Sequence, residues 1–287
     1  MCLDLGRPHR AANGGWHNIL RALLISPTTV LACLRAWSSV VDTGARSPAA
    51  ATLACNCRTT NNKRDFMTSK IDGASETLYR TQGMGQRIGF GERPAVLIID
   101  MQHDFCDADA ATTLWPSIQS TYDPIRQLCT AARARRIPVF YTQGLVAADG
   151  SSAGLWRLKM RAHAHSQVQV VGTKGAEIIP ELKPEPSDHV IRKWRPSAFF
   201  RTDFEVFLNT LRIDTLLVCG TSVSGCVRAT VTDGFMRDIR CVVVREAVAD
   251  RTPAVMEANL FDIDQKYADV VPAAEVLDYL NRFPLKN

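Results

Sequence analysis

The sequence predicts an α/β protein, a three-layer α/β/α sandwich around a mostly parallel six-stranded sheet. Two observations support this prediction. From residue 87 onward, short apolar runs alternate with segments of helical spacing, as in folds assembled from strand–helix units. The first run, Ala95 to Ile99, is apolar at every position, which is typical of a central parallel strand covered on both faces.

The elements follow one another in a regular order. The expected strands are residues 95–99, 137–142, 189–192, 216–219, 241–244 and 269–271. The expected helices lie at 118–132, after a capping box at Thr202 and Glu205, at 227–235, from the Thr252-Pro253 start signal, and at 273–282. Residues 144–187 form a long insertion, and a long loop in a compact domain is usually functional or disordered.

The most informative stretch is residues 214–230. Its apolar run ends in Cys219, a turn of small residues follows, and Cys226 begins the next helical segment. Unpaired N–H groups and the positive end of a helix dipole favour a thiolate at such a position. A lone cysteine is more often a small buried hydrophobe. A turn this small, however, lets another molecule approach the backbone, so Cys226 is a candidate nucleophile.

Two charged residues are expected beside Cys226. Asp100 follows the first strand, Lys193 ends the third, and Cys226 follows the fourth. Ligands of parallel sheets bind at the carboxyl ends of strands, so these three side chains should meet at one edge. Each has an ordinary explanation alone: the aspartate as a turn cap, the lysine as a solvated charge. That explanation is much weaker for the three together.

These segments resemble the cysteine-hydrolase (isochorismatase-like) superfamily, in particular the N-carbamoylsarcosine amidohydrolases. The resemblance extends over about residues 80–282 and rests on the ordered segments Arg87–Ala95, Val96–Phe105, Val190–Phe199 and Val218–Thr230. It implies the isochorismatase-like hydrolase fold, a three-layer sandwich, for the domain that we expect at residues 67–287.

The resemblance also implies roles for the three side chains. Cys226 would attack the substrate, Asp100 would take the thiol proton and return it to the leaving amine, and Lys193 would stabilise the thiolate. Backbone N–H groups of Ser222 and Cys226 would form the oxyanion hole. A cis peptide bond between Thr221 and Ser222 would shape that hole.

Arg251 is a candidate for substrate binding. It follows the fifth strand, in a segment resembling the amidohydrolase segment in which an arginine after aspartate holds the substrate carboxylate. A surface ion pair of Arg251 with Asp250 or Glu246 is the ordinary alternative. Two further arginines are placed to serve instead: Arg195 and Arg201.

No cofactor and no metal is expected. Nicotinamidases of this superfamily carry an Asp-x-His pair and a further histidine, whereas the corresponding region here, Asp107 to Pro116, lacks histidine. The close pair His163 and His165 would point apart on a helix and is assigned to a solvated loop. Isochorismatases themselves hydrolyse a vinyl ether without a nucleophilic cysteine, so Cys226 argues against that activity.

The first 66 residues differ from the remainder. They hold eight Lys or Arg and three Asp or Glu, and so account for the whole net charge of +5. The remaining chain offers no net field for nucleic acid or an anionic membrane. Residues 1–66 are interpreted as a mitochondrial-type transit peptide, a disordered tail, or codons upstream of a true start at Met67.

The nine cysteines are odd in number and irregularly spaced, which argues against a secreted disulfide framework. We therefore expect an intracellular, soluble protein, cytoplasmic or mitochondrial.

The sequence thus predicts a metal-independent cysteine amidohydrolase. Its substrate would be a small N-carbamoyl compound or amide carrying a carboxylate, cleaved with release of ammonia. The alternatives are a maleamate- or nicotinamide-type amidase and a catalytically silent oligomeric binding protein of the same fold. Expected partners are the small-molecule substrate and, by resemblance, further copies of the chain in a homo-oligomer, a tetramer. Neither nucleic acid nor membrane is expected as a partner.

Overall fold

The protein is represented by a computed structural model that describes residues 73–161 and 168–284. The chain divides into two units, Met1–Asn62 and Lys63–Asn287, and the described residues belong to the second. The predictions for residues 1–66, and for His163 and His165, lie outside the described residues.

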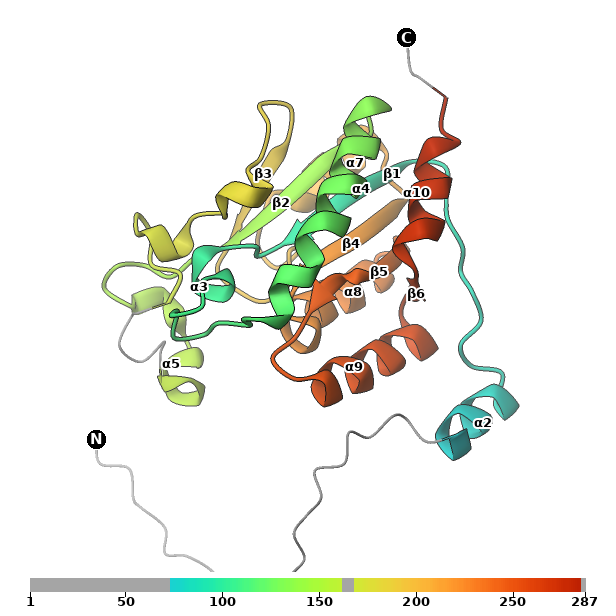
Figure 1. The fold of residues 1–287 in the computed structure, drawn as a ribbon, viewed down its shortest axis with the longest axis horizontal. Coiled ribbons are helices and arrows are strands. Elements are labelled where there is room, and N and C mark those ends of the chain that lie inside the picture. Colours follow the sequence, from blue (N-terminus) through green and yellow to red (C-terminus); the bar gives the residue numbers. More distant parts are fainter. Residues whose placement is uncertain (1–72, 162–167, 285–287) are drawn as a thin grey trace, which may run out of the picture. The chain divides into compact units, whose positions relative to one another are not determined.

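The described strands form one six-stranded sheet in the order β3-β2-β1-β4-β5-β6 (Figure 1). They are β1 (Pro94–Ile99), β2 (Val139–Gly144), β3 (His189–Lys193), β4 (Thr215–Thr221), β5 (Arg240–Ala249) and β6 (Asp269–Val271). The predicted α/β sandwich is confirmed, and the sheet is parallel at every neighbouring pair rather than mostly parallel.

Helices cover both faces of the sheet (Figure 1). The larger helices are α2 (Gly73–Thr81), α4 (Tyr122–Ala134), α7 (Phe204–Leu211), α8 (Arg228–Phe235), α9 (Pro253–Lys266) and α10 (Ala273–Asn281). Alternate residues of β1 face opposite layers, because side chains along a strand alternate in direction. Val96 and Ile98 pack with α4 and α10, whereas Leu97 and Ile99 pack with α7, α8 and α9.

Strand β5 is longer than the predicted run at 241–244. Its charged residues Arg245 and Glu246 interrupt the apolar pattern, and both are exposed. The strand bulges there, because Val218 pairs with Val243 while Gly220, two residues on, pairs with Val248. Periodicity alone therefore ended the strand too early, and the true strand extends to the residue before Asp250.

The helix-start predictions had opposite outcomes. Thr252 caps α9 as predicted, accepting a hydrogen bond from the Val255 N–H at 3.3 Å. The capping box at Thr202 does not form, because α7 begins one residue later than the box requires, with Asp203 at its N-cap. The Thr202 hydroxyl instead accepts from the Phe204 N–H.

The direction of the strand connections reverses between the neighbouring strands β1 and β4. Successive connections run outward from β1 toward β3 on one side and from β4 toward β6 on the other. The carboxyl ends of β1 and β4 lie at this reversal of direction, which is the usual binding position in open parallel sheets. The short helices α3 (His103–Cys106) and α5 (Trp156–Lys159) lie in the segments that follow β1 and β2.

None of the helices within residues 73–161 and 168–284 combines the length and the apolar character that crossing a membrane would need.

Gly220 makes the close approach of β4 to β1 possible. Its φ is 102°, and a Cβ there would lie 2.1 Å from the Ile99 carbonyl oxygen. We predict that Gly220→Ala lowers the free energy of unfolding by about 2–5 kcal/mol, combining left-handed strain with overpacking. Gly89→Ala is the matched control, since Gly89 has a φ of 74° and open space around it. Urea denaturation should show a loss of only about 1–2 kcal/mol for the control; equal losses would contradict the steric argument.

Candidate active site

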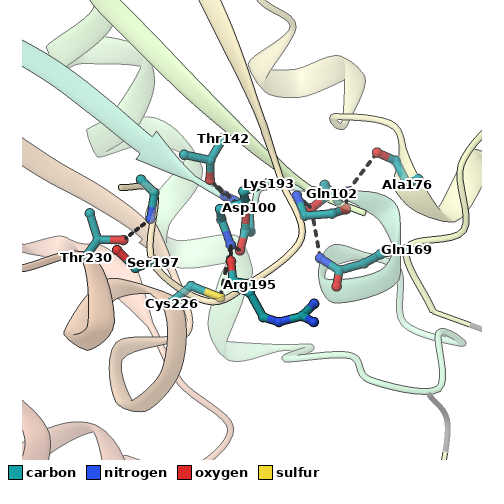
Figure 2. Close-up of polar contacts among 12 residues, drawn as sticks. Asp100, Gln102, Thr142, Gln169, Ala176, Lys193, Arg195, Ser197, Cys226 and Thr230 are labelled. Atoms are coloured by element: carbon teal, nitrogen blue, oxygen red, sulfur yellow. Dashed lines mark hydrogen bonds and ion pairs between the residues drawn. The ribbon is translucent and has the colours of Figure 1, made fainter. Parts of the chain in front are cut away.

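The three predicted side chains meet at the carboxyl edge of the sheet (Figure 2). Lys193 lies between the other two: its Nζ is 2.7 Å from Asp100 Oδ2 and 3.4 Å from Cys226 Sγ. The same ammonium donates a third hydrogen bond to the Arg195 carbonyl at 3.3 Å. The lysine is therefore held on three sides, with a carboxylate and a sulfur both within its reach.

Asp100 is fixed by a residue that the sequence analysis did not identify. Strands β1 and β2 pair Ile99 with Thr142, which brings the threonine beside the turn after β1. The Thr142 hydroxyl donates to Asp100 Oδ1 at 2.6 Å and accepts from the Asp100 N–H at 3.1 Å. Asp100 has a φ of 51°, in the left-handed region. In the sequence, Thr142 stands at the end of the second predicted strand, at the same edge of the sheet as Asp100, and this position was the available sign of its role.

Burial and the neighbouring groups act on the pKa of Lys193 in opposite directions. Asp100 is fully buried and Lys193 nearly so. Burial alone would lower the pKa of Lys193, but the adjacent Asp100 carboxylate and Cys226 raise it above its ordinary value. Lys193 is therefore a permanent cation at neutral pH.

Burial and the Asp100 carboxylate oppose the influence of the helix start on Cys226. Burial, followed by the negative charge of Asp100, raises the pKa of Cys226 to about 12, against the lowering influence of Lys193. The resting sulfur is therefore a thiol, as the expected proton transfer to Asp100 requires, although the helix start alone favours a thiolate. A hydrogen bond with the Asp100 carboxylate also raises the thiol pKa.

Cys226 lies in a single π-helical turn, Val223–Val227, that continues into α8. The Val227 N–H closes this turn on the Ser222 carbonyl at 3.1 Å. The peptide bond between Thr221 and Ser222 is cis. Ser222, Gly225 and Cys226 all line one pocket, so the backbone that was assigned to the oxyanion hole faces the same space as the thiol.

That pocket has a volume of about 240 Å³. Its apolar wall comprises Phe105, Leu145, Val146, Trp156, Met160 and Trp194. Its charged lining comprises Lys193, Arg195 and Arg251, and no Asp or Glu is among its described lining residues. The predicted insertion at 144–187 supplies much of the wall, including Trp156 and Met160. The pocket thus favours a small anionic molecule with an apolar portion.

A second polar network, not anticipated from sequence, fixes this insertion to β1 (Figure 2). The Gln102 amide donates to the carbonyls of Gly144 and Ala176, at 2.9 and 2.8 Å. Gln102 Oε1 accepts from the Gly144 N–H and from the Gln169 side chain, at 2.9 and 3.0 Å. Gln169 lines the pocket, so the fully buried Gln102 positions part of its wall from behind.

The three arginine candidates differ in placement. Arg251 is exposed at the pocket, and its guanidinium donates to the Thr112 carbonyl at 3.2 Å. Arg195 also lines the pocket, but its guanidinium donates to the Ser152 and Trp194 carbonyls, at 2.8 and 2.5 Å. Arg201 lies over the Phe200 ring, 5.7 Å from its centroid, and is not a lining residue. Within the described chain, neither Asp250 nor Glu246 forms an ion pair with the Arg251 side chain, and Glu246 accepts from the Ala273 N–H instead.

No cluster of three or more His, Cys, Asp or Glu side chains suited to a metal ion occurs in the portion of the chain that the structure describes. His103 lies near the region compared with the nicotinamidases, and its Nδ1 is 2.9 Å from Asp107 Oδ1. Asp107 also pairs with Lys174 at 3.2 Å.

Comparison with known proteins agrees with this geometry. Residues 94–275 match the Isochorismatase domain family. N-carbamoylsarcosine amidase of Arthrobacter sp. is 36% identical over 216 residues, 74% of this chain and 80% of that protein. Maleamate amidohydrolase of Pseudomonas putida is 35% identical over 200 residues, covering 68% of this chain and 91% of that protein. The crystal structure of a cysteine hydrolase from Pseudomonas syringae pv. phaseolicola superimposes with a TM-score of 0.63 at 27% identity, covering 67% of this chain and 94% of that one.

The raised thiol pKa makes a prediction about alkylation. Cys226 should react slowly with iodoacetamide at pH 7, and its rate should rise about tenfold per pH unit as the thiolate fraction grows. Asp100→Asn removes the negative charge that raises the pKa of Cys226, so the profile should shift to lower pH. Asp107→Asn, at an exposed ion pair, is the control and should leave the profile unchanged. Peptide mass spectrometry would assign the alkylated cysteine, and an unshifted Asp100→Asn profile would contradict this account of the pKa.

Proposed function

This chain belongs to the Isochorismatase domain family, and the proteins to which it is similar include two amidohydrolases. We propose how its own residues carry out amide hydrolysis. The chain is an amidohydrolase, a hydrolase of C–N bonds other than peptide bonds. We propose that it is a metal-independent cysteine enzyme whose substrate is a small N-carbamoyl compound or amide bearing a carboxylate. One observation is central: Lys193 contacts both Asp100 and Cys226, so the carboxylate and the sulfur share one cation.

The proposed first step is attack of the Cys226 sulfur on the amide carbon. The thiol proton passes to Asp100, the S–C bond forms, and the carbonyl electrons move onto oxygen. The N–H groups of Ser222 and Cys226 hold that oxyanion. Asp100 then gives its proton to the leaving nitrogen, the C–N bond breaks, and ammonia departs, leaving a thioester on Cys226.

The second step hydrolyses the thioester by the same residues. A water molecule at the vacated nitrogen position gives a proton to Asp100 and attacks the thioester carbon. Collapse of the intermediate breaks the S–C bond, and the proton held by Asp100 returns to sulfur. Lys193 stays protonated throughout, since its raised pKa keeps the charge in place.

The carboxylate preference rests on the pocket lining. Two arginines and one lysine face a space of about 240 Å³ without a facing carboxylate among the described lining residues. A guanidinium binds a carboxylate through two parallel charge-assisted hydrogen bonds. A maleamate-type substrate also combines an amide with a carboxylate, and the likeness to a maleamate amidohydrolase makes it the second candidate.

The nucleophile assignment predicts a specific loss of activity. Cys226→Ser should lose nearly all turnover while retaining substrate binding, because a serine hydroxyl is far harder to ionise beside the same base. Asp100→Asn should be comparably inactive, since residues acting as one unit are not additive. Ammonia release from N-carbamoylsarcosine, other N-carbamoyl amino acids, maleamate and nicotinamide would be measured after dialysis against EDTA.

Two results of this assay would contradict the proposal. A Cys226→Ser enzyme that keeps most of its rate would exclude the covalent route, and it would leave a non-covalent hydrolase of the same fold. Loss of wild-type activity on chelation, with recovery on adding metal, would exclude the metal-independent mechanism and favour a nicotinamidase-type enzyme.

The choice between the two pocket arginines gives a second prediction. Arg251→Ala should lower kcat/KM for N-carbamoyl acids roughly 30- to 1000-fold, the equivalent of about 2–4 kcal/mol for a partly buried charged hydrogen bond. Matched neutral carboxamides should lose much less. Arg195→Ala is the comparison, because the Arg195 guanidinium is already engaged by two carbonyls. An equal loss for both substrate types would remove Arg251 as the carboxylate anchor, and a selective loss in Arg195→Ala would transfer that role to Arg195.

A further inference from the structure

Asp250 is a buried carboxylate beside the active site that the proposed mechanism does not use. Its exposed fraction is 3%, and it follows β5 directly. Strands β4 and β5 stay paired as far as Thr221 and Ala249, so the next residues, Ser222 and Asp250, leave the sheet beside each other. Asp250 is therefore built into the base of the nucleophile turn.

Both carboxylate oxygens of Asp250 are engaged by backbone. Oδ2 accepts from the Ser224 N–H at 2.6 Å, and Oδ1 accepts from the Arg251 N–H at 2.7 Å. The Ser117 hydroxyl donates to the Asp250 carbonyl at 3.0 Å, which fixes the residue from a third direction. In the described ranges, no lysine, arginine or histidine side chain forms an ion pair with Asp250. Its described side-chain contacts are therefore to backbone.

The two backbone donors belong to the two halves of the site. Ser224 lies between Ser222 and Cys226, whose N–H groups are assigned to the oxyanion, and it lines the pocket. Arg251 is the assigned carboxylate anchor and lines the same pocket. The Asp250 carboxylate thus connects the segment that would bind the reacting end of a substrate with the segment that would bind its carboxylate. A displacement of about 1 Å at such a position can lower a rate about 100-fold.

We propose that Asp250 is a positioning residue that holds the nucleophile turn and the Arg251 anchor in a fixed relative position. This inference rests on the proposed function. The negative charge also suits its place, since a carboxylate at the first turn of a helical segment satisfies N–H groups that lack intrahelical partners. Asparagine cannot replace it, because its amide offers one acceptor oxygen and turns an NH₂ donor toward the other backbone N–H.

The chain contains a matched control for this substitution. Asp269 is equally buried, and its two oxygens accept from the N–H groups of Ile88 and Gly89, at 2.9 and 2.7 Å. It lies at β6, and neither it nor its partners line the pocket. Asp269 Oδ2 also pairs with Arg87 at 3.5 Å, so Asp269→Asn disturbs the same kind of backbone interaction and one further ion pair, away from the site.

The test uses two small aldehydes, propanal and succinate semialdehyde. The Cys226 thiol adds across an aldehyde carbonyl: the S–C bond forms, the S–H bond breaks, and the proton ends on the former carbonyl oxygen. That oxygen occupies the oxyanion position, and succinate semialdehyde adds a carboxylate for Arg251. Dissociation constants would be measured on the full chain as protection of Cys226 from iodoacetamide, so no turnover is needed. Melting temperatures would be recorded for each variant.

We expect Asp250→Asn to weaken the binding of propanal roughly 10- to 100-fold, because the oxyanion donors are displaced. The binding of succinate semialdehyde should weaken more strongly. Asp269→Asn should melt at a lower temperature but bind both aldehydes like the wild type. If Asp250→Asn does not fold, Asp250→Glu serves instead, since it keeps both acceptor oxygens on a longer side chain. Its losses of aldehyde affinity should be smaller, and again larger for succinate semialdehyde than for propanal.

Four results would overturn the proposal: wild-type affinities in the Asp250 variants, losses in Asp269→Asn equal to those in Asp250→Asn, a wild type that neither aldehyde protects, or equal weakening of the two aldehydes. The last result would remove the connection to Arg251. The proposed function fails separately, if wild type is protected by the aldehydes and releases no ammonia from any amide.

Discussion

The buried ion pair between Asp100 and Lys193 is the constraint on which the rest of the site depends. A buried charge is strongly unfavourable unless it is paired and hydrogen-bonded, so each partner requires the other. Thr142 and the Arg195 carbonyl supply the remaining hydrogen bonds. These groups come from the ends of β1, β2 and β3 and from the residues just after β3, so only a sheet with this order and register brings them together.

The segments that carry Cys226 and Arg251 are also held in position at this edge of the sheet. The turn that carries Cys226 follows β4, Arg251 follows β5, and the Asp250 carboxylate accepts hydrogen bonds from the backbone of both segments. The segments at the ends of β1 to β3 therefore supply the buried ion pair. The segments after β4 and β5 hold Cys226 and Arg251 in position through Asp250. The boundary between the two groups of strands is the reversal of strand order between β1 and β4.

The sequence predicted the six strands and the meeting of Asp100, Lys193 and Cys226, because apolar runs and strand ends are local patterns. It did not predict the hydrogen bonds of Thr142 and Gln102 or the bond from Ser224 to Asp250, because these partners lie many residues apart and meet only through the strand register. The extension of β5 was missed because Arg245 and Glu246 break the apolar pattern at a bulge. The size of the Cys226 pKa rise was not predictable either, because burial, its largest cause, is not visible in the sequence.

Because Cys226 is protonated, Lys193 can pair with the negative charge of the cluster at either of two positions, Asp100 or the sulfur. In the resting cluster, Asp100 and Lys193 carry opposite charges and Cys226 is neutral. In the proposed transfer of the proton from sulfur to Asp100, the negative charge moves too, and the net charge of the cluster stays the same. Lys193 Nζ lies 2.7 Å from one site of that charge and 3.4 Å from the other, so the charge is paired before and after the transfer. The raised pKa of Cys226 is therefore compatible with a cysteine nucleophile, because at no stage does the transfer leave a buried charge unpaired.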